Sequence, residues 1–285
     1  MSQKAFKEVA VTNALPGFEL SRNDAIKKAI AVRFEEKIRK AILLLKEYEP
    51  EEGYVLCFSG GKDSVVIKAI AIAAGVNFKS VYNQTTIDPP ELVRFIQKYH
   101  ADVAWNRPGK NLVFKMLEKT SGPPTRRSRW CCEIYKERNN AGVKIIGVRA
   151  AESPKRSALW NTLNLKNAAL DVIAPVLYWS DNDVWRFIRE QKLPYCRLYD
   201  EGFKRLGCVG CPMSGPGQMK KEFVRWPGFE RLWQIGFRLF WEKYAGTVNR
   251  YGKSRWFNRF KSWQEMWAWW LIENSEPDDC QGRLF

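Results

Sequence analysis

A glycine-containing segment, Ser59-Gly-Gly-Lys-Asp-Ser64, carries residue types that bind phosphate or sulfate groups. Gly60 and Gly61 allow the backbone to approach an anion closely, and N–H groups at the start of a following helix would point at it. Lys62 adds a positive charge to the same segment. We therefore expect the segment to bind an anionic group, with Lys62 also a catalytic candidate.

The other side chains of this segment add hydroxyl groups and a carboxylate. Ser59 and Ser64 supply donors, and Asp63 could cap the helix or help to hold Mg²⁺. The segment is not a Walker A loop, because that pattern requires a glycine at the position of Leu56. An ordinary turn between a strand and a helix is the alternative interpretation, and the flanking patterns favour anion binding over it.

Four of the seven cysteines form two close pairs, Cys131-Cys132 and Cys208-Val-Gly-Cys211. A Cys-x-x-Cys segment puts two sulfurs within reach of one metal ion or cluster, and two further thiolates would complete a set of four ligands. Adjacent cysteines are awkward ligands for one tetrahedral zinc ion, although they can reach different irons of one cluster. Zinc, an iron–sulfur cluster and a redox disulfide between Cys208 and Cys211 are therefore competing interpretations.

The hydrophobic pattern places these residues between alternating strands and helices. Apolar residues at 54–58 predict a strand before the glycine segment, and residues 65–74 predict a helix after it. Further strands are predicted at 78–82, 103–105, 143–148 and 171–174. Further helices are predicted at 91–99, 112–117 and 183–190, the last with Asp181 as its cap. This alternation predicts an α/β protein with a doubly wound, mostly parallel sheet, which binds ligands beyond the carboxyl ends of its strands.

Composition divides the chain into three expected regions. They are an N-terminal helical segment at 1–50, the nucleotide-binding α/β domain with the cysteines at 51–212, and a helical, tryptophan-rich, basic appendage at 213–285. Trp233, Phe237 and Trp241 recur at helical spacing in the appendage, which indicates a packed core more than a base-stacking platform.

The chain is strongly basic, with 47 Lys and Arg against 31 Asp and Glu, a net charge of +16 and a pI near 9.6. This balance favours an anionic partner such as a small nucleotide, DNA or tRNA. Basic residues of the appendage could track a nucleic-acid backbone or form an ordinary solvated face; they are Arg225, Arg231, Arg238, Lys243, Arg250, Lys253, Arg255, Arg259 and Lys261. Because no apolar run is long enough for a membrane span or a secretory signal, we expect a cytoplasmic protein without a membrane partner.

Several motifs together resemble known families. With Ser59–Ser64 between a strand and a helix, the sequence resembles the PP-loop adenine nucleotide α-hydrolase superfamily, whose signature is SGGxDS. The Cys-Cys pair followed by Cys-x-x-Cys resembles the iron–sulfur adenylylsulfate reductases of the phosphoadenosine phosphosulfate (PAPS) reductase family. The segment 147–153 is similar to the G-x-R-x-x-x-S anion loop of that family, and 179–185 with 207–212 is similar to its closing segment. The resemblance covers about residues 50–215.

The resemblance implies a fold of the adenine nucleotide α-hydrolase type, an adenine nucleotide (adenylylsulfate, PAPS or ATP), and Mg²⁺ if ATP is the substrate. It implies nucleotide contacts from Ser59, Gly60, Gly61, Lys62, Asp63, Ser64, Thr85, Gly147, Arg149 and Ser153. It also implies a [4Fe-4S] cluster on Cys131, Cys132, Cys208 and Cys211. A reductase of this kind would need a thioredoxin-like electron donor.

The sequence departs from the reductases at two places. Around Thr85 the stretch reads Gln-Thr-Thr-Ile-Asp-Pro-Pro-Glu, where the family often has Asp-Thr-Gly before Pro-Glu. The reductases end in Glu-Cys-Gly-x-His, whose cysteine attacks sulfur, whereas this chain has Cys280 after two aspartates and lacks the histidine. Cys280 is the candidate nucleophile, although acidic neighbours would raise the pKa of its thiol and weaken it.

Two activities, and one role without catalysis, fit these observations. A sulfonucleotide reductase explains the cysteine pattern. An ATP-dependent sulfurtransferase acting on nucleic acid, similar to the enzymes of DNA phosphorothioation or tRNA thiolation, explains the complete SGGKDS loop and the basic appendage. A nucleotide-binding regulator without catalysis is the third alternative, because the reductase tail is incomplete.

Overall fold

The structure is a computed structural model, and it describes residues 22–137, 141–152, 157–158, 161–166, 169–247 and 259–273. The chain divides into two compact units. Unit 1 comprises Met1–Val81 and Asn140–Tyr195, and unit 2 comprises Tyr82–Asn139 and Cys196–Phe285. The domain ranges expected from composition, 1–50, 51–212 and 213–285, stay a prediction.

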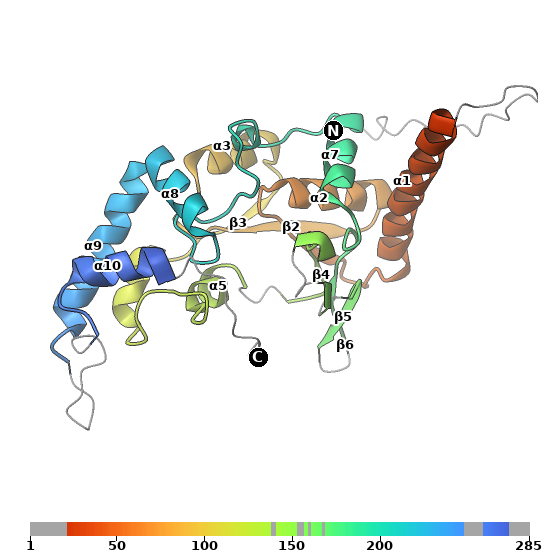
Figure 1. The fold of residues 1–285 in the computed structure, drawn as a ribbon. Helices are drawn as coiled ribbons and strands as arrows, with labels where there is room; N and C mark the ends of the chain where they lie inside the picture. The colour runs from red at the N-terminus through yellow and green to blue at the C-terminus, as the bar shows by residue number, and fades with distance from the viewer. Residues whose placement is uncertain are drawn as a thin grey trace, which may run out of the picture. The chain divides into compact units, whose positions relative to one another are not determined.

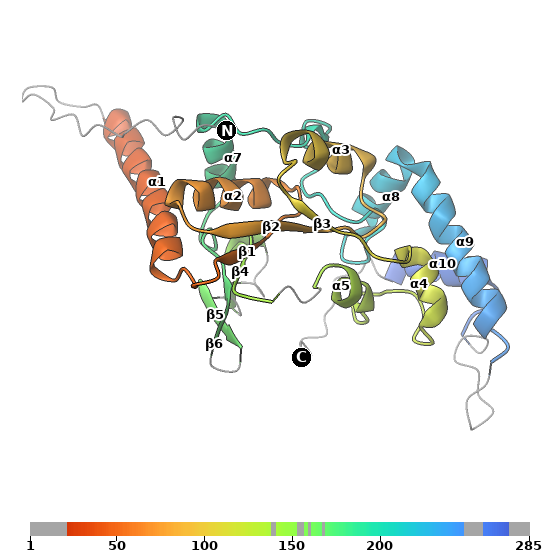
Figure 2. The same cartoon turned by 180° about the vertical axis from the view of Figure 1, so that it is seen from behind.

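A six-stranded sheet has the strand order β3-β2-β1-β4-β6-β5. The strands are β1 (Tyr54–Cys57), β2 (Phe78–Asn83), β3 (Ala104–Asn106), β4 (Lys144–Ile145), β5 (Leu163–Lys166) and β6 (Ala169–Ile173). Strand β1 pairs in parallel with β2 and with β4, and β4 pairs in parallel with β6 (Figure 2). The predicted α/β architecture with a mostly parallel sheet is thus confirmed.

One strand of the sheet was not predicted. Strand β5 pairs antiparallel with β6. Its sequence, Leu-Asn-Leu-Lys, is too short to stand out as a strand pattern, and the antiparallel pairing depends on its neighbour in the hairpin. The sequence therefore revealed only the second arm of this hairpin.

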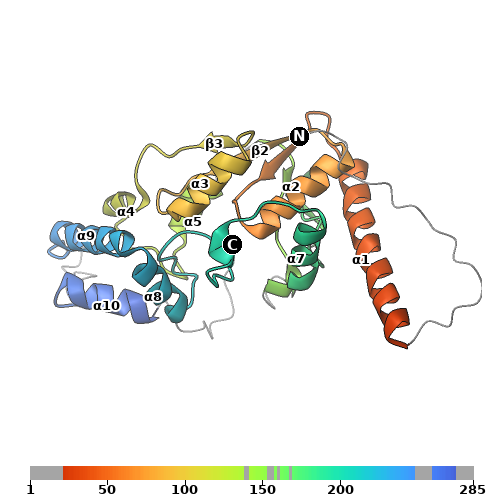
Figure 3. The same ribbon diagram turned by 90° about the horizontal axis from the view of Figure 1, so that it is seen from above.

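Three helices pack side by side in unit 1. They are α1 (Arg22–Glu47), α2 (Lys62–Ala74) and α7 (Asp181–Glu190), with α1 against α2 and α2 against α7 (Figures 1 and 3). Their contacts bury apolar side chains such as Phe34, whose ring meets Trp179 edge to face. Helix α7 is capped by Ser180, which accepts from the N–H of Asp183, and not by Asp181 as the sequence suggested. Serine fits better because its side chain reaches the third residue of the helix.

Unit 2 contains shorter helices and an aromatic core. Its helices are α3 (Pro90–Tyr99), α4 (Leu112–Lys115), α5 (Trp130–Tyr135), α8 (Pro216–Arg225), α9 (Pro227–Tyr244) and α10 (Trp263–Glu273). Short 3₁₀ turns lie at Met116–Glu118 and Arg197–Tyr199 in this unit, and at Ala150–Glu152 in unit 1. Helices α8, α9 and α10 pack together (Figure 1).

Large aromatic side chains fill the space between α9 and α10. Trp233 and Phe237 of α9 are fully buried against Trp270 of α10, with ring centroids 5.0 and 5.3 Å apart. The predicted aromatic core is confirmed at these positions, and the third residue of the stripe, Trp241, is half-buried. Aromatic pairs at these distances stabilise a core beyond their buried area.

No helix within the described ranges is long and apolar enough to cross a membrane.

Candidate nucleotide and cysteine sites

The glycine segment forms a tight turn between β1 and α2 in unit 1. Gly60 has φ of +74°, in the left-handed region that favours glycine, and Gly61 is the N-cap of α2. The hydroxyl of Ser64 donates to the carbonyl of Gly61 at 2.8 Å, and this hydrogen bond within the segment stabilises the turn. A glycine N-cap has no side chain to satisfy the N–H groups of the first turn, so an anion could accept hydrogen bonds there.

Two basic and two acidic side chains form a network beside this turn. Lys62 Nζ lies 3.5 Å from Asp63 Oδ2 and 3.2 Å from Asp181 Oδ1. Arg149 Nε donates to Asp63 Oδ1 at 2.6 Å, and its Nη2 donates to Asp181 Oδ1 at 3.0 Å. Both cations are buried, and burying a charge is costly unless an opposite charge pairs with it. The network therefore holds two positive charges close to the N-terminus of α2.

The order of the strands brings these residues together. Strands β1 and β4 are neighbours, so the loops that follow them meet at the same edge of the sheet. Gly147 makes the close approach possible, because a Cβ there would lie 3.0 Å from the carbonyl carbon of Asp63. The glycine of the predicted anion loop thus allows Arg149 to reach the helix that follows the glycine segment.

The structure groups some of the predicted nucleotide contacts and not others. Ser59 to Ser64, Gly147 and Arg149 lie together in unit 1. Thr85 belongs to unit 2, where its hydroxyl accepts from the thiol of Cys208. Ser153 lies outside the described residues, as does Cys280. Asp181 was missed as a member of the site because a carboxylate at a helix start normally indicates only a cap.

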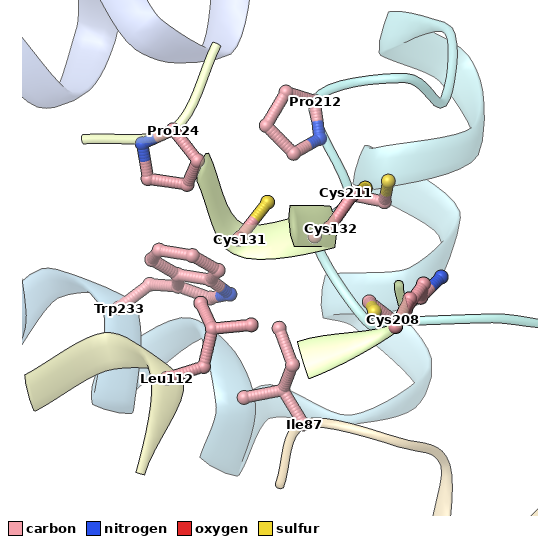
Figure 4. Close-up of a pocket in the computed structure, with 11 residues that line it drawn as sticks. Ile87, Leu112, Pro124, Cys131, Cys132, Cys208, Cys211, Pro212 and Trp233 are labelled. Carbon is pink, nitrogen blue, oxygen red and sulfur yellow. The ribbon is translucent and has the colours of Figure 1, made fainter. Parts of the chain in front are cut away.

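The four predicted ligand cysteines line one hollow in unit 2. Helix α5 carries Cys131 and Cys132, and the loop before α8 carries Cys208 and Cys211 (Figure 4). The hollow has about 300 Å³ of space between atoms, part of it open to solvent. Its other walls are mostly apolar: Ile87, Leu112, Pro124, Pro212 and Trp233. The sequence pairs are thus joined into one set of thiols by tertiary structure.

Hydrogen bonds from three directions hold the loop with Cys208 and Cys211. The N–H of Val209 donates to the carbonyl of Ile87 at 2.8 Å, and Trp233 Nε1 donates to the carbonyl of Val209 at 3.1 Å. The N–H of Gly210 donates to the buried carboxyl of Glu222 at 2.8 Å. The appendage helices α8 and α9 therefore position the second cysteine pair, a role that the sequence did not reveal.

Position 210 requires glycine for its backbone conformation and for the packing around it. Its φ is +73°, and a Cβ there would lie 2.7 Å from Phe223 Cζ and 2.8 Å from Trp233 Nε1. Both the backbone conformation and the aromatic packing therefore exclude a larger residue.

The thiols interact electrostatically with one another and with a lysine. A hydrogen bond from Cys131 lowers the pKa of Cys132 and raises that of Cys131. Burial raises the pKa of Cys208 to about 12, while the positive charge of Lys136 opposes the shift. Lys136 is an exposed residue that also lines the hollow, and the charge of Cys208 is the main cause that raises the pKa of Lys136. The hollow thus favours a group with net negative charge beside the lysine.

The described cysteines carry no disulfide, so the alternative bond between Cys208 and Cys211 is not formed in this structure. In the part of the chain that the structure describes, no three His, Cys, Asp or Glu side chains converge closely enough to hold a single metal ion.

The predicted basic contacts on α8 and α9 divide into two groups. Arg225 donates to Glu91 and Glu201, and Lys243 donates to the carbonyl of Leu117, so both are used within unit 2. Arg231 and Arg238 of α9 are exposed. Three further predicted contacts, Arg250, Lys253 and Arg255, lie outside the described residues.

Comparisons with known proteins show which family this chain resembles. The family model of the phosphoadenosine phosphosulfate reductase domain matches residues 53–214. An uncharacterised protein of Methanocaldococcus jannaschii is 28% identical over 250 residues, 81% of this chain and 49% of that protein. A second uncharacterised protein of the same organism is 30% identical over 68% of this chain and 50% of its own length. The chain therefore spans about half the length of these two relatives.

Relatives with named activities are more distant. The adenosine 5'-phosphosulfate reductase of Bacillus cereus is 26% identical over 215 residues, which is 68% of this chain and 88% of that protein. Among solved structures, the PAPS reductase of Candida auris in its phosphate complex is 15% identical, with a TM-score of 0.46, over 68% of this chain and 98% of that one. The match to the family model, which covers more than half of the residues, shows that the chain belongs to the PAPS reductase family.

Proposed function

We propose that this protein binds an adenine nucleotide at Ser59–Ser64 and performs sulfonucleotide reductase-type chemistry on adenylylsulfate or PAPS. The observation that carries the proposal is the set of four free thiols around one hollow. Nucleotide binding alone does not need them. The APS reductases among the relatives support the same class of reaction.

The nucleotide part of the proposal is supported by charge. Adenylylsulfate and PAPS carry phosphate and sulfate groups, which need several donors and positive charges in one place. The turn at Gly60 and Gly61 offers backbone N–H groups, and Lys62 and Arg149 offer two buried cations. Helix α2 adds the partial positive charge of its N-terminus.

The thiols of unit 2 fit a [4Fe-4S] cluster better than a zinc ion. One zinc ion binds sulfur at about 2.3 Å and requires its ligands to converge on one point, whereas a cluster spreads its ligands over several irons. Cys131 and Cys132 are adjacent in sequence, which suits ligands of different irons, and they line a common hollow with Cys208 and Cys211. When bound, the cluster would supply an electrostatic environment beside the ammonium of Lys136.

The reaction assigned to the protein's own residues begins with a cysteine thiolate, for which Cys280 is the candidate. The thiolate attacks the sulfate sulfur, a new S–S bond forms, and the S–O bond to the nucleotide phosphate breaks with the electron pair leaving on AMP or its 3'-phosphate. A thioredoxin-like dithiol then reduces the thiosulfonate, becomes a disulfide, and releases sulfite and the free cysteine. Lys62 and Arg149 would neutralise the leaving phosphate.

One experiment tests this proposal. The protein is purified anaerobically and given adenylylsulfate or PAPS with a dithiol, and sulfite is measured. We expect sulfite release that is lost in Cys280→Ser. Sulfite release that survives Cys280→Ser would remove Cys280 as the nucleophile, and absence of sulfite from both nucleotides would contradict the reductase proposal.

A second function is favoured by the exposed cations of α9, Arg231 and Arg238, which lie beyond the residues matched by the family model. An ATP-dependent sulfurtransferase would hold the pyrophosphate of ATP and Mg²⁺ at the same loop while it adenylates a nucleic acid. Exposed arginines could then contact the phosphate backbone of DNA or tRNA. Release of pyrophosphate from ATP, stimulated by DNA or tRNA, would favour this function over the reductase.

A further inference from the structure

One exposed carboxylate covers both buried cations of the nucleotide site. Asp181 Oδ1 lies 3.2 Å from Lys62 Nζ and accepts from Arg149 Nη2 at 3.0 Å. The side chain of Asp181 is 59% exposed, whereas those of Lys62 and Arg149 are 7% and 4% exposed. A single carboxylate oxygen therefore contacts both buried cations, from a side chain that is itself mostly exposed.

The other acid of the network, Asp63, has a different character. It is 19% exposed, it belongs to α2 itself, and its backbone lies against Gly147. Its carboxylate also receives the Nε–H of Arg149 at 2.6 Å. Asp63 is thus a fixed part of the site, because neither its backbone nor its carboxylate can move without disturbing Arg149.

Helix capping does not account for the position of Asp181. Ser180 and Asp183 form the capping box of α7: the N–H of Asp183 donates to Ser180 Oγ, and the N–H of Ser180 donates to Asp183 Oδ2. The side chain of Asp181 takes no part in either bond. A carboxylate in the first turn is stabilised by the helix dipole even when it points to solvent. Asp181 can therefore leave the two cations at a low cost to α7.

We propose that Asp181 is an internal competitor for the nucleotide's anionic group. Without nucleotide, its carboxylate occupies the position on Lys62 and Arg149 that a phosphate or sulfate oxygen takes on binding. The two buried cations then keep an anionic partner in both states, as buried charges require. This inference rests on nucleotide binding at Ser59–Ser64 as proposed above.

The competition has a consequence for selectivity. A ligand group with one negative charge replaces the carboxylate of Asp181 with no gain in electrostatic attraction to the two cations. A dianionic or more highly charged group is attracted to both cations more strongly than the carboxylate is. Asp181 would thus set a threshold that favours phosphate and pyrophosphate groups over carboxylates. The apparent dissociation constant equals the intrinsic one divided by the fraction of molecules in which Asp181 is displaced. Removal of the carboxylate raises this fraction to one and therefore strengthens binding.

The test compares wild type with Asp181→Asn and with the matched control Glu152→Gln. Glu152 Oε1 lies 3.9 Å from Arg149 Nη2, so the control removes one negative charge beside the same arginine without uncovering Lys62. Titration calorimetry with inorganic pyrophosphate and with adenylylsulfate gives the affinities. We expect Asp181→Asn to bind pyrophosphate about 5- to 10-fold more tightly than wild type, and Glu152→Gln to change the affinity less than about twofold. Asp181→Ser should shift the affinity in the same direction as Asp181→Asn.

Three outcomes would overturn the inference in distinguishable ways. Equal affinities of Asp181→Asn and Glu152→Gln would show only a general charge effect. Weaker binding by Asp181→Asn, confined to solutions with Mg²⁺, would make Asp181 a ligand of a metal-bound nucleotide. If the folded wild type and all variants bind neither pyrophosphate nor adenylylsulfate, the proposed nucleotide site itself is wrong.

Discussion

The two candidate sites of this protein differ in their surroundings, which are charged in unit 1 and mostly apolar in unit 2. In unit 1 the candidate nucleotide site consists of charges that neutralise one another, with Lys62 and Arg149 between Asp63 and Asp181. In unit 2 the thiols lie among apolar walls, and their loop is held by Trp233 and Glu222. The first arrangement suits an exchangeable anion, whereas the second suits a group that stays bound in a rigid cradle.

The two sites should also differ in the substitutions that they tolerate. Charged groups near solvent can reorganise when a ligand enters, because water and ions replace lost partners. The aromatic side chains around the cysteine loop are packed as densely as atoms in an organic crystal, so even one added carbon lowers the stability of the fold. Changes in the two units should therefore fail in different ways, affinity being lost in unit 1 and assembly or stability in unit 2.

The largest effect is expected at the cysteines. Cys208→Ser removes one of the four thiols on the hollow and should lower bound iron and sulfide from about four per chain to nearly none after anaerobic reconstitution. Colorimetric iron and sulfide assays measure this result. Cys57→Ser is the control, because Cys57 lies in β1 of unit 1 and should leave the iron content unchanged. Full iron content in Cys208→Ser would contradict the assignment of the ligands.

Gly210→Ala should be the most destabilising single substitution considered. The added Cβ would meet Phe223 and Trp233 at less than 3 Å in a left-handed backbone, which we expect to cost about 3 kcal/mol of unfolding free energy. Urea unfolding measures the loss. Gly228→Ala, in α9 with open space around it, should change stability by less than about 1 kcal/mol. Equal stabilities of the two variants would show that the loop is not held rigidly.

Lys62→Met tests the charged site alone. Removal of one buried cation deletes a charge-assisted hydrogen bond worth about 2 kcal/mol, so pyrophosphate affinity should fall about 30-fold while iron content stays full. Calorimetry and an iron assay on the same sample give both values. Lys40→Met removes an exposed lysine that pairs with Glu36, and it should leave both unchanged. A loss of iron in Lys62→Met would mean that the two sites are not independent.

The smallest effect on stability is expected at Glu222, whose carboxyl accepts from the N–H of Gly210 in the cysteine loop. Burial raises the pKa of Glu222 above its usual value, although hydrogen bonds from Gln218 and Gly210 oppose the shift. The folded state then binds a proton more tightly than the unfolded state, so this group's stabilising effect is present at low pH and is lost as pH rises through the raised pKa. Glu222→Gln should therefore gain up to about 1 kcal/mol relative to wild type between pH 4 and pH 8, measured by urea unfolding. An identical pH dependence of both proteins would show that Glu222 ionises as easily in the folded state.

Local patterns predicted the strand, the turn and the helix that form the candidate nucleotide site. The strand before Ser59, the two glycines and the helix after them are neighbours in sequence, so their arrangement follows from the chain itself. Arg149 was predicted through its family motif, and the structure places its guanidinium on Asp63. Asp181 was missed because its contacts arise from the packing of α7 against α2, which no local pattern contains.

The sequence by itself determined the α/β architecture, the glycine turn between β1 and α2, and the identity of the four thiols, because each depends on spacing along the chain. Only the tertiary structure decided that the thiols share one hollow, that Trp233 and Glu222 of the appendage hold their loop, and that Asp181 covers Lys62 and Arg149. The hydrogen bonds and ion pairs named here join residues separated by 12 positions (Gly210 and Glu222) to 119 positions (Lys62 and Asp181). They depend on side-chain packing that no periodic pattern encodes.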